Sequence, residues 1–184
     1  MLRRLGMVVA VSSVLLVVSA CGNESTASTT AGLRLDQIEN ALDAVEQEAG
    51  EDLEFFEINA TSAVVNVFVA TDLDGTPNAD GLPDAVVRYV FSEQDGLEVA
   101  PDPVGANGAT FTRAALDYEP TSILNQALSE LPESKPQMFV LTAAGTAEES
   151  TGVVQYRLII QSTQGGQMSI VLTNTGEIVG TDAE

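Results

Sequence analysis

The sequence predicts an α+β fold of two similar helix-plus-antiparallel-sheet halves, in the order αβββ–αβββ, with the helices packed on one sheet face. Three observations predict this fold. Two segments have apolar residues at helical spacing, each is followed by several short strand-like runs, and the connections between runs suit antiparallel hairpins. We expect a single domain over residues 33–184, with halves of about 33–99 and 116–181.

The first predicted helix starts near Leu35 and carries acidic residues opposite its apolar side. Gly50 supplies a C-terminal stop. Strand-like runs rich in Val, Phe and Tyr follow, at residues 54–59, 63–71, 85–92 and, after a turn, 97–99. Residues 100–112 contain two Pro and two Gly, which predicts a linker.

The second half repeats this order. A helix follows Pro120, with Thr121 or Ser122 as its N-cap, and Pro132 ends it. Strand-like runs come next, at residues 138–142, 153–162, 167–173 and 177–179. The similar order of the two segments predicts a tandem repeat.

The composition excludes several kinds of function. The chain of 184 residues has 27 acidic and 7 basic side chains, no His and one Cys. Without His there is no imidazole base or His-bound metal, and one Cys forms no internal disulfide. A formal net charge of −20 argues against a nucleic-acid partner, because neutralising phosphates requires Lys and Arg.

The first twenty-one residues predict export. Arg3 and Arg4 precede an apolar stretch, Leu5 to Val18, which is about 21 Å long as a helix and too short to span a bilayer of about 30 Å. Residues 1–20 therefore form a signal peptide. The run Val18-Ser19-Ala20-Cys21 resembles the lipobox of bacterial lipoproteins, and the resemblance implies a lipid on Cys21, which becomes the first mature residue. The alternative is ordinary signal-peptide cleavage, which releases a soluble protein.

Loss of residues 1–20 removes two arginines and no acid, which lowers the formal net charge from −20 to −22. Anionic headgroups repel such a protein. We therefore expect it to attach to the membrane through acyl chains on Cys21. Residues 21–32 are the lipidated Cys and a small, polar, flexible tether, whose eleven residues after Cys21 span roughly 18 Å.

Two weak family resemblances concern the folded part. The strand–Thr175-Gly176-Glu177–strand ending resembles PepSY-type modules of exported bacterial proteins, and the tandem αβββ order is similar to beta-lactamase inhibitor proteins. Both imply a role in binding an unknown extracytoplasmic protein or ligand.

One segment resembles an enzyme motif. The apolar run ending in Asp72-Leu73-Asp74-Gly75-Thr76 is similar to motif I of haloacid dehalogenase-like phosphatases. That resemblance implies Asp72 as nucleophile and Asp74 as general acid/base, with Mg²⁺ bridging carboxylate and phosphate. Ser92 and Lys135 would stand for the second and third motifs.

An overlapping segment, residues 78–87, resembles the calcium loops of FG-GAP-type repeats. Ca²⁺ prefers six to eight oxygen ligands, which short side chains at alternate positions of a turning loop supply. We predict a possible Ca²⁺ site formed by Asp74, Asn78, Asp80 and Asp84, and no other cofactor. The alternative is a solvated acidic hairpin turn.

Together these patterns predict a lipid-anchored, extracytoplasmic lipoprotein of the bacterial cell membrane that acts as a non-enzymatic binding module. The rival hypothesis is a phosphatase that uses Asp72 and Asp74.

Overall fold

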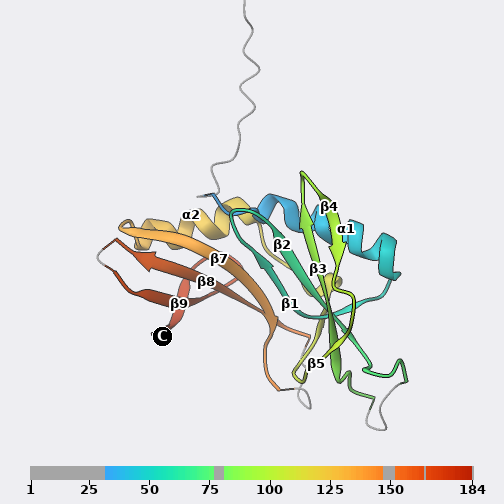
Figure 1. Ribbon diagram of the computed structural model, residues 1–184. Helices are drawn as coiled ribbons and strands as arrows, with labels where there is room; N and C mark the ends of the chain where they lie inside the picture. The colour runs from blue at the N-terminus through green and yellow to red at the C-terminus, as the bar shows by residue number, and fades with distance from the viewer. Residues whose placement is uncertain (1–31, 77–80, 147–151, 164, 184) are drawn as a thin grey trace, which may run out of the picture.

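The computed structural model describes residues 32–76, 81–146, 152–163 and 165–183, and its strands form one sheet (Figure 1). The helical elements are η1 (Leu35–Gln37), α1 (Ile38–Ala49), η2 (Arg113–Ala115) and α2 (Pro120–Glu130). The strands are β1 (Glu54–Ala60), β2 (Val65–Thr71), β3 (Ala85–Ser92), β4 (Gly96–Val99), β5 (Val104–Gly105), β6 (Phe111–Thr112), β7 (Ser134–Ala143), β8 (Val154–Ser162), β9 (Gln167–Leu172) and β10 (Ile178–Ala183).

The sheet is antiparallel, ten-stranded and continuous. Its main path runs β10-β9-β8-β7-β1-β2-β3-β4, with β5 beside β3 and β6 beside β1. At the centre of this path β1 pairs with β7, from Glu57 opposite Thr142 to Ala60 opposite Phe139.

This central pairing corrects the predicted fold class. The αβββ–αβββ arrangement of two helix-plus-sheet halves is wrong, because the chain forms one large antiparallel sheet with two short helices. Two separate halves would each expose the polar backbone edge of a first strand, whereas pairing β1 with β7 hydrogen-bonds those edges to each other. The alternation of apolar and polar residues within a strand indicates which face of the strand is buried, but it does not indicate which strand lies beside it.

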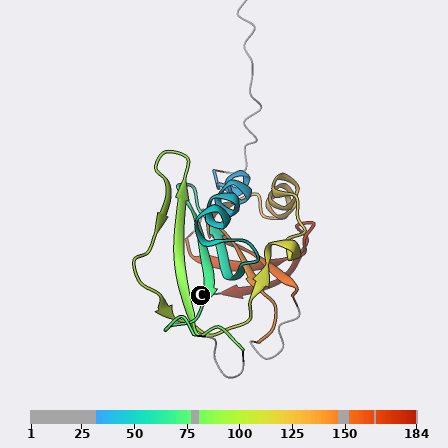
Figure 2. The same cartoon turned by 90° about the vertical axis from the view of Figure 1, so that its right-hand side faces the viewer.

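A single apolar core joins the sheet to both helices. Helix α1 packs against β2, β3 and β4, and Ile38, Ala41, Leu42 and Val45 on its inner side are buried. Helix α2 contributes Ile123, Leu124 and Ala127 to the same core. Figure 2 shows the two helices nearly end-on, with the strands around them.

One predicted helix end agrees with the structure, and another differs from it. The Gly50 N–H donates to the Glu46 carbonyl at 3.0 Å, so Gly50 ends α1 as predicted. The N-cap of α2 is Glu119 rather than Thr121 or Ser122. Its carboxylate accepts from the Ser122 N–H at 2.7 Å and the Thr121 N–H at 3.3 Å. The hydrogen bonds from Ser122 lower the pKa of Glu119.

The predicted linker contains two short strands. β5 pairs with β3, and β6 places Phe111 opposite Phe55 of β1. Both rings are buried, with their centroids 5.8 Å apart. The connection therefore belongs to the sheet and the core.

Candidate functional site

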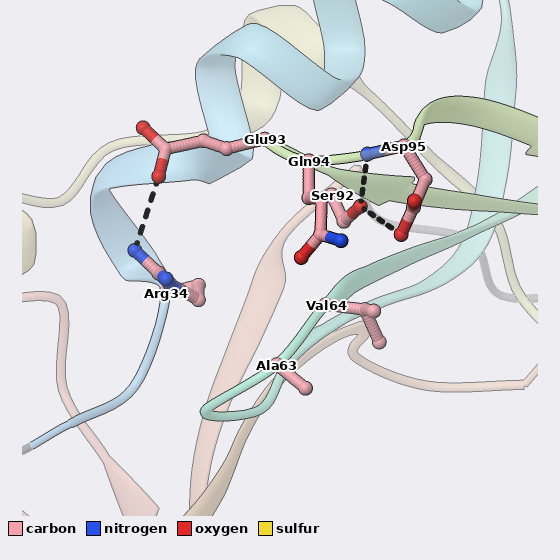
Figure 3. Close-up of a pocket in the computed structure, with 7 residues that line it drawn as sticks. All are labelled: Arg34, Ala63, Val64, Ser92, Glu93, Gln94 and Asp95. Carbon is pink, nitrogen blue, oxygen red and sulfur yellow. Dashed lines mark hydrogen bonds and ion pairs between the residues drawn. The ribbon is translucent and has the colours of Figure 1, made fainter.

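An open groove lies where the chain enters the folded domain (Figure 3). Its volume is about 550 Å³. Three segments form it: the residue before η1, the β1–β2 turn and the β3–β4 turn. The lining residues are Arg34, Ala63, Val64, Ser92, Glu93, Gln94 and Asp95.

An ion pair closes one side of the groove. The Arg34 Nη1 atom lies 3.3 Å from Glu93 Oε2, and Gln37 Nε2 donates to Glu93 Oε1 at 3.2 Å. The Arg34 and Glu93 side chains are 43% and 61% exposed, so water screens their attraction. The pair positions the β3–β4 turn beside η1 and adds little stability.

A hydroxyl and a carboxylate meet on the opposite side of the groove. The Ser92 Oγ donates to Asp95 Oδ2 at 3.2 Å and accepts from the Asp95 N–H at 2.9 Å. The pair holds the β3–β4 hairpin turn, and both side chains line the groove as hydrogen-bonding groups.

The described acids of the predicted calcium loop are engaged by the backbone. Asp84 Oδ1 accepts from the Leu73 N–H at 2.8 Å, and Asp74 Oδ1 accepts from the Thr76 N–H at 2.9 Å. Asn78 and Asp80 lie outside the described residues. Within the described ranges, no group of three Asp, Glu, Cys or His side chains is arranged to hold a metal ion. Calcium binding stays a prediction.

The residues of the phosphatase resemblance lie far apart. β2 and β3 pair from Val65 opposite Phe91 to Thr71 opposite Ala85. Asp72 follows one end of this hairpin and Ser92 the other, so the length of β2, roughly 23 Å, separates them. Lys135 lies in β7, beyond the Ala60 end of β1 and also far from Asp72.

The structure also contains two clusters of interacting side chains that no sequence motif predicts. Arg113 of η2 contacts three carboxylates of α1: Glu39 at 2.6 Å, Asp43 at 2.8 Å and Glu46 at 2.7 Å. Partial burial acts to lower the pKa of Arg113, but these hydrogen bonds outweigh it and raise the pKa. The cluster joins segments about seventy residues apart, which no local pattern predicts.

The second cluster surrounds Tyr156. Its hydroxyl donates to the Asp117 carbonyl and accepts from the Asp117 N–H, both at 3.1 Å, and Asn174 Nδ2 donates to Asp117 Oδ2 at 3.1 Å. Burial raises the pKa of Tyr156. A shallow hollow of about 390 Å³ lies over these residues. Their hydrogen bonds tie the segment before α2 to β8 and to the β9–β10 turn.

Comparison of the chain with protein-family models, with curated proteins and with solved structures finds no match. Among the described residues, no helix has the length and apolar character needed to cross a membrane. Cys21 and the predicted signal peptide, residues 1–20, lie outside the described residues.

Proposed function

We propose that this protein is an exported bacterial lipoprotein whose folded domain is a non-enzymatic binding module on the extracytoplasmic face of the membrane. The observation that carries the proposal is the position of Cys21. It is the only Cys in the chain, it directly follows the apolar export signal and small residues, and eleven residues separate it from Leu33, which is buried. This order matches an acyl anchor, a tether and a folded domain.

Several features favour binding over catalysis. Asp72 and Asp74 follow a strand whose two neighbours are antiparallel to it, whereas the phosphatase motif belongs to a parallel, doubly wound sheet. The carboxylate of Asp74 shapes its own turn through the Thr76 N–H. The groove beside Arg34 presents an arginine, carboxylates, an amide and a hydroxyl around an open hollow. Such a surface suits recognition of a polar partner.

Mass spectrometry of the protein extracted from membranes tests the anchor. We expect the mature chain to begin at Cys21 with a diacylglyceryl group on its sulfur, because the lipobox directs modification and cleavage there. Cys21→Ser should abolish the modification while leaving the domain folded, since the core begins at Leu33. Unmodified Cys21 in protein recovered from the culture medium would establish simple secretion instead.

An assay with a phosphomonoester and Mg²⁺ tests the alternative hypothesis that the protein is a phosphatase. We expect no turnover. Turnover that Asp72→Asn abolishes would contradict the proposal and assign the protein to the phosphatases.

A further inference from the structure

The chain enters its folded domain at a fixed point. Leu33 and Leu35 are buried in the core on either side of Arg34. The Arg34 N–H donates to the Thr61 carbonyl in the β1–β2 turn at 2.8 Å, and its guanidinium pairs with Glu93 in the β3–β4 turn. Contacts with the core and two turns therefore define one end of the molecule, which we call the entry end.

The β2–β3 and β7–β8 connections begin and end at the opposite end, the far end. In both views the described chain starts beside the upper ends of the strands, and the described flanks of these connections lie at the lower ends (Figures 1 and 2). Strand β2 joins the two ends, and it pairs with β3 along its whole length. Leu73 lies ten positions after Ala63 in the entry-end turn, and this offset corresponds to roughly 33 Å of extended chain.

The two ends differ in charge. The connection from Asp72 to Asp84 has four Asp and no Lys or Arg, and the three Asp that are described lie at the far end. At the entry end, the β1–β2 turn, residues 61–64, has no charged residue, and the β3–β4 turn has two acids, of which Glu93 is paired with Arg34 and Asp95 accepts a hydrogen bond from Ser92. An anionic lipid surface attracts cations and repels carboxylates within a Debye length of about 8 Å. It would therefore repel the far end more strongly than the entry end.

The tether is short compared with the domain. The sequence predicts a tether of eleven small, polar residues after Cys21, and a coil of that length spans roughly 18 Å. A domain of about 150 residues has a radius of gyration near 15 Å, which corresponds to a diameter approaching 40 Å. Because the attachment point is fixed at the entry end, a tether of this length keeps that end close to the headgroups.

We propose that the domain stands on the membrane in one orientation, with the β1–β2 and β3–β4 turns facing the phospholipid headgroups and the acidic β2–β3 connection facing away. This inference rests on the proposed lipid anchor. It places the Arg34 groove on the membrane side and presents the far end to extracytoplasmic partners.

Energy transfer from the protein to the membrane surface tests the orientation. The lipidated full-length protein carries a single new cysteine, at Ala63 or at Leu73. Both positions are exposed, and lipidation occupies the Cys21 thiol. A maleimide donor on that cysteine transfers to an acceptor on headgroups in vesicles of phosphatidylcholine and phosphatidylglycerol. We expect transfer from position 63 to exceed that from position 73 by about twofold or more, because position 73 lies up to roughly 33 Å farther away.

Three controls make the result decisive. Inserting about 20 Gly and Ser residues in the tether raises its span to roughly 30 Å and should bring the two efficiencies together. Vesicles of phosphatidylcholine alone have no net negative charge. They should reduce the difference in transfer efficiency between positions 63 and 73 without reversing it. In protein that floats with vesicles, equal or reversed transfer, or a difference that the longer tether leaves unchanged, overturns the orientation alone. Protein that does not float overturns the lipid anchor, and the orientation with it.

Discussion

At the scale of single residues, Arg113 forms ion pairs with three carboxylates. Its side chain is about one-third exposed, and it lies between three carboxylates spaced along one side of α1. Carboxylates at such spacing repel one another on a helix, so the guanidinium offsets this repulsion as it holds η2 against α1. Arg113 therefore stabilises the path of the chain between β6 and α2.

Arg113→Gln should lower the free energy of unfolding by about 1–2 kcal/mol, because it removes the charge that the three acids share. Urea denaturation measures the change. Arg34→Gln is the matched control, and its loss should be below about 1 kcal/mol because both partners are largely exposed. Equal losses for the two variants would show that the three-carboxylate cluster has no special role.

The loop from Asp72 to Asp84 poses a second question at this scale. If Asp74, Asn78, Asp80 and Asp84 bind Ca²⁺, the soluble Cys21→Ser protein should give saturable heat in calorimetric titration, with millimolar-range affinity typical of extracellular sites. Asp80→Asn combined with Asp84→Asn should abolish that heat. Asn keeps the oxygen that accepts from Leu73, so the turn is preserved. An absence of saturable heat up to roughly 10 mM Ca²⁺ would leave a solvated hairpin turn.

At the scale of elements, the β9–β10 turn lies close against the backbone of α2 at Gly176. Gly176 has a φ of +94°, and a Cβ atom there would lie 2.5 Å from the Ile123 carbonyl oxygen and 2.9 Å from the Ile123 Cα. Both contacts involve helix backbone, which cannot rotate away. The Asn174-Thr175-Gly176 sequence predicts a turn, but its contact with α2 follows only from the packing.

Gly176→Ala should therefore destabilise the protein by about 2–4 kcal/mol, through backbone strain together with displacement of α2. Thermal unfolding followed by circular dichroism measures the loss. Gly96→Ala is the matched control, because Gly96 has a φ of +75° in the β3–β4 hairpin but nothing within 4 Å of its Cβ position. It should cost only about 1–2 kcal/mol. A loss at Gly176 no greater than that at Gly96 would refute the close-contact argument.

Elements with a strong apolar pattern are predictable from the sequence. β3 spans the predicted residues Ala85–Ser92, because this run is rich in Val, Phe and Tyr and lies between two turns. α1 ends at Gly50, where the helical pattern stops. β5 and β6 are only two residues long, so periodicity cannot detect them. The candidate groove could not be predicted from the sequence either, because Arg34 and Glu93 lie 59 residues apart and neither belongs to a motif.

At the scale of the whole molecule, the central pairing of β1 with β7 sets the architecture. It joins Ile58 and Ala60 to Leu141 and Phe139 in one core, and it gives the molecule two ends of different charge. Attachment at the entry end and acidity at the far end would together orient a tethered domain. The acids belong to the β2–β3 connection, but their position opposite the point where the chain enters follows from how the strands are ordered.

The sequence by itself determined the two α-helices, the longer strands and where the acidic residues gather, because local periodicity and turn residues decide these features. The predicted signal peptide and the single Cys also supply the whole basis of the predicted anchor. Only the tertiary structure decided that the strands form one sheet, that Arg113 meets three carboxylates and that Glu119 caps α2. A strand pattern indicates a buried face but leaves its partner open. Which strands become neighbours depends on two requirements: the polar backbone edges must be hydrogen-bonded, and the apolar faces must form one core. Both requirements involve residues far apart in the chain.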